Sequence, residues 1–201
     1  MLIIDFFLRG GFFMGALLLL SVISLSIIFQ RIWALRLRQV IPSSLKLAVD
    51  QYQTGTSLEP LSQQLQKNDS PLSRILQTLI HHSDWPRAEA LDAVEVRARH
   101  EIARLETGLT FLEIGTGIAP LLGLLGTLSG LVDIFANIGD KGDPQLVAVG
   151  ISQALNSTIV GLAVAVPCLI AFHYLSRRVE MIAIEIEAVT AELITKIYLK
   201  K

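Results

Sequence analysis

The chain has 201 residues, of which 52% are hydrophobic and only 17% are charged, and its net charge is -1. A soluble domain usually carries about a quarter charged residues, so this composition indicates a membrane protein. The near-neutral charge excludes nucleic-acid binding by bulk electrostatics, and the single cysteine, Cys168, excludes an intrachain disulfide.

The first predicted span covers residues 12–30 and follows an N-terminal segment, residues 1–11. Its length matches the roughly 20 residues that a helix needs to cross a bilayer. A signal peptide is the alternative, but the apolar run is longer than a signal peptide needs. Asp5 precedes it, and no cleavage site of small residues follows. We therefore expect a retained transmembrane helix, with Trp33 at the membrane interface.

Residues 31–109 are predicted to form a helical loop. Its first half is amphipathic, with breaks at Gly55 and Pro60. Two helix starts are expected, one at Asp69-Ser70-Pro71 and one at Asp84-Trp85-Pro86. The stretch from Arg87 to Thr107 includes the i,i+4 pair Glu95 and Arg99 and shows no breaker before the next span. We therefore predict one continuous helix that leaves the membrane.

The second and third spans are predicted at residues 110–138 and 146–175, joined by a short turn at 139–145. An amphipathic helix should follow over residues 176–201. Its apolar residues recur at helical spacing, and we expect this face to pack on a neighbour beyond the chain itself; they are Ile182, Ile186, Val189, Leu193 and Ile197.

Arginines predict the orientation, because cytoplasmic flanks of membrane helices carry an excess of positive charge. Arg31, Arg36 and Arg38 follow the first span, and Arg177 and Arg178 follow the third. The N-terminus and the turn should then be periplasmic, and the loop and the C-terminus cytoplasmic. The predicted fold is all-α, with three spans and with the second and third helices extending into the cytoplasm.

Thr127 and Thr158 each lie near the middle of their span. At 1.5 Å per residue, both are about 20 Å from the turn, so they should share one level in the membrane. A threonine in a membrane helix can bond its own i-4 carbonyl or a neighbouring helix, and it can also face water or an ion path. Both interpretations stay open at this point.

Gln153, Asn156 and Ser157 fall on one face of the third span, at i, i+3 and i+4. They can be interhelical hydrogen-bonding groups or part of a water- or ion-facing surface. Small residues on both spans predict close helix packing; they are Gly123, Gly126, Gly130, Gly150, Ala154, Gly161 and Ala165. Pro120 and Pro167 each remove a backbone donor inside a span and predict kinks.

The sequence shows no pattern typical of a catalytic or metal-binding site. The histidines at 81, 82 and 100, with Asp84, match no zinc spacing. No Gly-x-Ser-x-Gly, P-loop or His-Glu-x-x-His motif occurs. We therefore expect no metal, no cofactor and no enzymatic activity.

Two stretches carry a family resemblance. The run from Ala119 to Thr127 with Gly130 and Phe135, and the run from Gly150 to Pro167, resemble the ExbB/TolQ/MotA proton-channel family, closest to ExbB and TolQ. Ser70-Pro71-Leu72 with Arg74 is also similar to that family. The specific match covers residues 113–167, and the topology match covers the whole chain.

The resemblance implies a homopentamer in the inner membrane, with the second and third spans lining a central pore. The pore would hold single membrane helices of an ExbD/TolR-like partner, whose carboxylate carries protons past the threonine level. Thr127 and Thr158 match the two polar pore positions of the family. Force would then reach a TonB-like or another periplasm-spanning client, and the sequence does not choose among TonB-type, Tol-type and other systems.

Gln153 departs from the family pattern, because many ExbB-like members have a glutamate there. An amide does not titrate, so the proton-carrying carboxylate would belong to the partner, and coupling to H⁺ or Na⁺ stays open. The predicted function is that of a channel-forming subunit in a motor driven by the proton-motive force. A structural membrane scaffold and a stand-alone channel or transporter are the alternatives.

Overall fold

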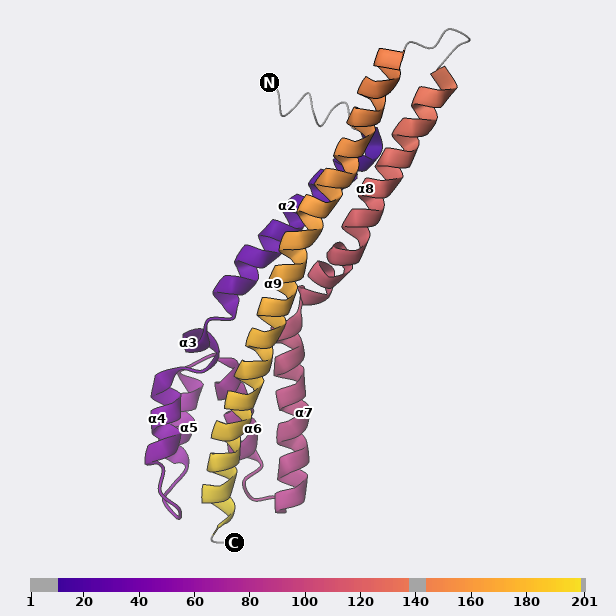
Figure 1. Cartoon of the computed structure of the whole chain (residues 1–201). Coiled ribbons are helices and arrows are strands. Elements are labelled where there is room, and N and C mark those ends of the chain that lie inside the picture. Colours follow the sequence, from indigo (N-terminus) through magenta and orange to yellow (C-terminus); the bar gives the residue numbers. More distant parts are fainter. Residues whose placement is uncertain (1–10, 138–143, 200–201) are drawn as a thin grey trace. The chain divides into compact units, whose positions relative to one another are not determined.

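The computed structural model describes residues 11–137 and 144–199, and every regular element in these ranges is a helix (Figure 1). The chain divides into two compact units. Unit 1 combines Met1–Gln30 with Gly108–Tyr174, and unit 2 combines Arg31–Thr107 with Leu175–Lys201. Nearly all of the predicted N-terminal segment, 1–11, and most of the predicted turn, 139–145, lie outside the described residues.

Three helices are long and apolar enough to cross a membrane: α2 (Gly11–Ala34), α8 (Leu109–Asn137) and α9 (Pro144–Tyr198). The last has 55 residues, and its apolar first part belongs to unit 1 while its end belongs to unit 2. An all-α fold with three membrane-spanning helices is therefore confirmed.

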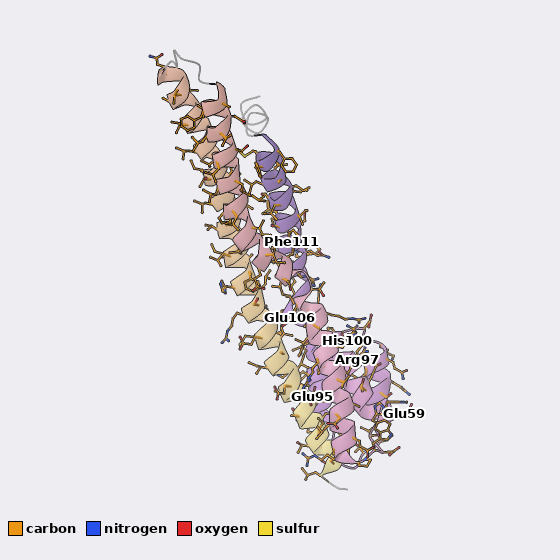
Figure 2. The ribbon with its side chains drawn as sticks, turned by 90° about the vertical axis from the view of Figure 1, so that its right-hand side faces the viewer. Glu59, Glu95, Arg97, His100, Glu106 and Phe111 are labelled. Carbon is orange, nitrogen blue, oxygen red and sulfur yellow. The ribbon has the colours of Figure 1, made fainter. Side chains whose placement is uncertain are left out.

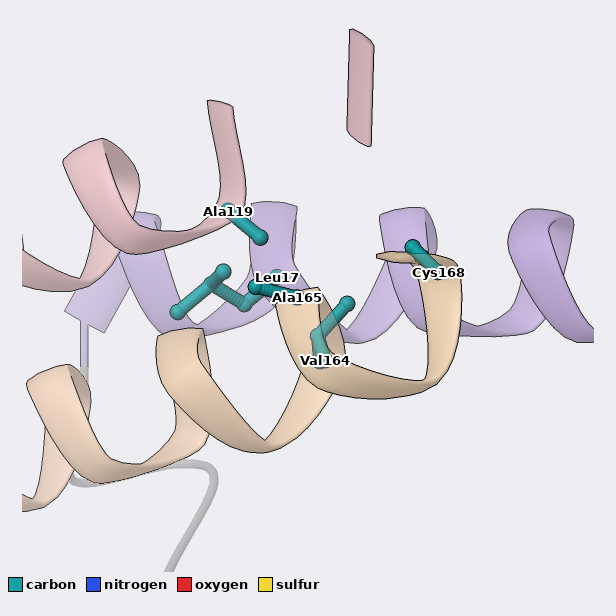
Figure 3. Packing of buried hydrophobic residues seen from close by; sticks show 5 residues of the cluster. All are labelled: Leu17, Ala119, Val164, Ala165 and Cys168. Carbon is teal, nitrogen blue, oxygen red and sulfur yellow. The ribbon is translucent and has the colours of Figure 1, made fainter. Parts of the chain in front are cut away.

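Small side chains allow these three helices to pack together in unit 1. The core cluster combines Leu17 of α2 and Ala119 of α8 with Val164, Ala165 and Cys168 of α9 (Figure 3). Cys168 is a free, buried thiol, and it fills space here as a small apolar side chain.

Unit 2 contains five shorter helices and the end of α9. The helices are α3 (Leu37–Val40), α4 (Ser43–Gln51), α5 (Glu59–Gln66), α6 (Pro71–His81) and α7 (Arg87–Glu106).

Local sequence signals explain where these helices begin and end. Ser70 caps α6, because its hydroxyl accepts a hydrogen bond from the Ser73 amide at 3.2 Å. The predicted start before Pro86 is confirmed by α7, and the predicted break at Gly55 is confirmed by its positive φ of 89°. Pro60 lies in the first turn of α5, where a missing amide proton costs nothing, so it starts a helix and does not break one.

The prediction of one continuous helix from Arg87 into the second span is wrong. Helix α7 ends at Glu106 and α8 begins at Leu109. Between them Gly108 has a φ of 83°, a left-handed conformation that commonly terminates helices and that a right-handed helix cannot contain. Neither hydrophobic periodicity nor charge spacing contains information on this backbone angle.

The apolar face at the end of α9 is covered by the chain itself, so the prediction that it requires a neighbour beyond the chain is wrong. Ile182, Ile186 and Leu193 are at most 2% exposed within unit 2. Polar contacts hold the helix in place: Lys196 donates to the Val49 and Asp50 carbonyls of α4 at 2.8 and 3.0 Å. These carbonyls belong to the last turn of α4, where helices leave acceptors unsatisfied.

Candidate functional site: a hydroxyl pair between two membrane helices

Glycines bring α8 and α9 into backbone contact within unit 1. A methyl group on Gly123 would lie 2.8 Å from the Ser157 carbonyl oxygen and 3.0 Å from Cα of Thr158. A methyl group on Gly161 would lie 2.6 Å from the Ala119 carbonyl oxygen. Because backbone atoms cannot move aside as a flexible side chain does, both positions require glycine.

The other predicted small residues lie along the same contact. A methyl group on Gly126 would collide with the Ser157 hydroxyl, and one on Gly130 would lie 3.0 Å from the Ala154 side chain. Gly150 faces only the flexible end of the Ile134 side chain, at 2.7 Å. Ala154 and Ala165 are each 6% exposed.

At this contact the hydroxyls of Thr127 and Thr158 lie 2.6 Å apart, so the two threonines share one level as predicted. The Thr127 oxygen also lies 3.1 Å from the carbonyl of Gly123 in its own helix and 3.1 Å from that of Ala154 in α9. The Thr158 oxygen lies 3.4 Å from the Gly123 carbonyl. Two hydroxyl protons therefore face several acceptors, and each hydroxyl can both donate and accept.

Of the three residues predicted on the polar face of α9, the structure shows a buried side chain near the threonine pair for Ser157. Ser157 is 3% exposed, and its hydroxyl has no hydrogen-bond partner in the part of the chain that the structure describes. Asn156 is half-buried. The side chain of Gln153 lies outside the described structure, so its place on this face stays a prediction.

Pro120 and Pro167 lie inside α8 and α9, and neither ends its helix. The kinks expected at these prolines therefore stay predictions.

A second polar cluster, in unit 2, surrounds Glu101 of α7, which is 0% exposed. Arg74 of α6 donates to both of its carboxylate oxygens, at 3.0 and 2.7 Å. Arg97 lies 2.9 Å and Arg104 3.8 Å from the same carboxylate, and Arg74 also pairs with Asp69 at 2.6 Å.

These contacts determine the ionisation of the cluster. Burial by itself raises the pKa of Glu101, but the hydrogen bonds from Arg74 and the charges of the three arginines outweigh it and lower the pKa overall. The hydrogen bond to Glu101 also raises the pKa of Arg74. Sequence reasoning missed Glu101, although the i,i+4 and i,i+3 spacings of Arg97, Glu101 and Arg104 were a usable signal.

A pair of hydroxyls at a glycine-lined contact between long apolar helices defines a multi-span membrane protein with a polar site in its hydrophobic part. Comparison with known proteins shows that the chain belongs to the MotA/TolQ/ExbB proton channel family, whose profile matches residues 67–188, more than half of the chain. The resemblance noted from the motifs is thereby confirmed.

Three relatives illustrate the similarity. The chain is 34% identical over 183 residues to a putative biopolymer transport protein ExbB-like 1 of Synechocystis sp., covering 86% of this chain and 70% of the relative. It is 28% identical over 153 residues to the biopolymer transport protein ExbB of Neisseria gonorrhoeae, covering 68% of this chain and 70% of the relative. It is 29% identical over 205 residues to the Tol-Pal system protein TolQ of Haemophilus influenzae, covering 89% of this chain and 86% of the relative.

Family membership and the apolar helices together identify an inner-membrane protein of a proton-channel family that takes part in energised envelope transport.

Proposed function

We propose that the chain is the channel-forming subunit of an inner-membrane motor driven by the proton-motive force, which energises outer-membrane or envelope transport together with an ExbD/TolR-like single-span partner. The observation that carries this proposal is the Thr127–Thr158 hydroxyl pair, at 2.6 Å between two membrane helices. In the proposal five copies surround a pore lined by α8 and α9. The arginines after the first and third spans favour a periplasmic N-terminus and a cytoplasmic C-terminus.

The two threonines would serve an ion that passes their level. A hydroxyl can donate to a carboxylate on a partner helix or accept from a protonated one, and it does not itself need to titrate. Ser157 adds a buried hydroxyl with no partner in the described structure, next to this pair. Gln153 would contribute hydrogen bonds only, which leaves proton carriage to the partner's carboxylate.

One observation favours a structural scaffold as the second candidate. The threonine hydroxyls already bond one another and the carbonyls of Gly123 and Ala154, so they can act as interhelical hydrogen bonds alone. In membrane proteins such bonds contribute roughly 0.6 kcal/mol each. Their removal would then weaken packing slightly and change nothing else.

The test is replacement of each threonine by valine, which keeps the shape and removes the hydroxyl. Thr116→Val is a matched control, because Thr116 also lies on α8 and, among the described residues, bonds only its own i-4 carbonyl, of Leu112, at 3.0 Å. The proteins are co-expressed with an ExbD/TolR-like partner and reconstituted in liposomes, and proton flux, client activity and assembly are measured.

Thr127→Val and Thr158→Val should lower flux and client activity at least about tenfold while the assembled fraction stays near the wild-type value. Thr116→Val should retain both activities. If the double threonine variant retains normal flux and client activity, the hydroxyls are packing groups and take no part in the ion path. A wild-type complex that assembles but conducts no protons would favour the scaffold function.

A further inference from the structure

The surface of unit 2 has an open groove that the proposed channel function does not use. One chamber, of about 890 Å³, is lined by polar residues of α5, α6, α7 and the segment between α5 and α6, among them Asn68, Arg74, Gln77, His81 and Arg97. A second chamber, of about 710 Å³, lies along α6 and α7 and includes Trp85, Val96 and His100. Both chambers are lined by Thr78, His82 and Arg97, so they adjoin one another. Their volumes are in the range of small-molecule sites.

The first chamber has an excess of positive charge. Its wall contains two arginines, Arg74 and Arg97, and its one carboxylate, Asp69, is paired with Arg74 at 2.6 Å. Behind the wall, Glu101 is a single carboxylate shared by three arginines. Arg97 lies 2.9 Å from Glu101 through Nη2, and its buried Nε has no hydrogen-bond partner in the described ranges. A guanidinium with donors to spare matches a phosphate oxygen.

The second chamber has an aromatic and apolar surface. The Trp85 ring is 46% exposed and lies 4.0 Å, centroid to centroid, from the ring of His82. Val96 is 70% exposed on the same side of α7, where an apolar side chain contributes nothing to the core. Figure 2 shows Arg97 and His100 near one another on this helix, and both line the second chamber.

Two carboxylates at the second chamber make that end of the groove negatively charged. Glu89 and Asp92 line it, are exposed, and form no ion pair within the residues that the structure describes. They repel phosphate from the aromatic end and can accept hydrogen bonds from amino groups of a planar ring.

We propose that this groove binds a nucleotide, with its phosphates against Arg97 and His81 and its base stacked on Trp85. A flat ring attached to an anion is the ligand chemistry that uses both chambers. Inorganic phosphate would use only the cationic one, and a neutral aromatic molecule only the other. Arg97 lines both chambers and would therefore meet the ligand where its two parts join.

Trp85 provides a direct signal for the test, because Trp33 is the only other tryptophan. The full-length protein carrying Trp33→Phe is titrated in detergent with ATP, with tripolyphosphate and with adenosine, and the fluorescence of Trp85 is recorded. ATP should quench it saturably with a Kd below about 1 mM, and tripolyphosphate and adenosine should each bind at least about tenfold more weakly. Calorimetric titration of the protein with both tryptophans gives an independent Kd.

Two variants and a control test the assignment of the residues. Arg97→Gln should raise the Kd for ATP about tenfold, the loss expected for one charge-assisted hydrogen bond. His81→Gln should also weaken binding. The His81 side chain makes no hydrogen bond within the described part of the chain, so this variant remains informative if Arg97→Gln unfolds the unit. Arg99→Gln is the control, because Arg99 pairs with the exposed Glu95 and lines neither chamber.

Several results would overturn the proposal. Absence of saturable quenching by ATP would exclude the site. Equal affinity for tripolyphosphate would show a general polyanion surface, and equal affinity for adenosine would show that the cationic chamber takes no part. An unchanged Kd in folded His81→Gln and Arg97→Gln would place the nucleotide elsewhere.

Discussion

Gly123 and Gly117 lie on the same helix and have opposite surroundings. A methyl group on Gly123 would meet the backbone of α9 at 2.8 Å, whereas one on Gly117 would meet nothing within 4 Å in the subunit. Gly123→Ala should therefore lower the free energy of unfolding by about 1–3 kcal/mol, the usual cost of overpacking, because α8 and α9 must separate. Gly117→Ala should be neutral or slightly stabilising, since alanine favours a helix more than glycine does. Thermal unfolding of both variants in the same detergent compares them, and equal destabilisation would contradict the assigned contact.

Glu101 should be the most sensitive charged residue of unit 2, because its loss leaves three arginines facing one another. Glu101→Gln should lower the free energy of unfolding by about 3–5 kcal/mol, the usual effect of breaking a buried ion pair. Glu95→Gln, which breaks the exposed pair with Arg99, should change it by less than about 1 kcal/mol. Chemical unfolding of the two variants measures this difference, and similar values would contradict the role of burial.

The pH dependence of the Glu101 contribution follows from the lowered pKa of its carboxyl. The carboxyl of Glu101 has a pKa of about 4.3 in the unfolded chain and a lower pKa in the folded protein. The stabilisation is therefore fully present above the unfolded pKa and is lost as the pH falls through the folded pKa. The difference in unfolding free energy between the wild type and Glu101→Gln should stay constant from about pH 6 to 8. A difference that disappears within that range would contradict the assignment.

The end of α9 offers a matched pair of isoleucines. Ile186 is 2% exposed and Ile184 is 53% exposed, two residues apart on one helix. Ile186→Ala should lower the free energy of unfolding by about 2–5 kcal/mol, because it leaves a cavity between α9 and the helices of unit 2. Ile184→Ala should change it by about 0.5 kcal/mol or less. Thermal unfolding of the two variants tests this, and equal effects would mean that the apolar face is not covered within its own chain.

Sequence patterns predicted the helices better than the contacts that the helices make with one another. Apolar length predicted the three spans, and counting residues from the turn predicted that Thr127 and Thr158 lie at one level. The break at Gly108 was missed because a positive φ leaves no trace in hydrophobic periodicity. The part of Arg74 in the Glu101 cluster could not be predicted, because Arg74 and Glu101 are 27 residues apart and only the tertiary structure brings α6 to α7. The amphipathic pattern predicted that Ile182 is buried, but it could not show whether the same chain or another one covers it.

At the scale of the whole molecule, the surface of unit 1 shows what a single chain leaves uncovered. Phe135, Ile159 and Ile170 are each more than 60% exposed, as suits lipid or a neighbouring helix, but Ser129 is also exposed and Asn156 is half-buried. Polar side chains on a membrane helix are expensive in lipid and usually face protein or water. Apolar burial drives no association between helices within a bilayer, so close packing and hydrogen bonds must supply it.

This surface and the family resemblance together predict a homopentamer around a pore. Native mass spectrometry of the purified protein in detergent should show the pentamer as the main species, and the Thr127→Val and Thr158→Val variants should give the same distribution, because their hydroxyls bond within one chain. Gly123→Ala serves as the contrasting variant. It separates α8 from α9 inside each subunit, so it should reduce the pentamer in step with its loss of stability. A monomer or dimer as the only wild-type species would contradict the pentamer, and the polar face of α9 would then need the partner subunit, or lipid headgroups, to cover it.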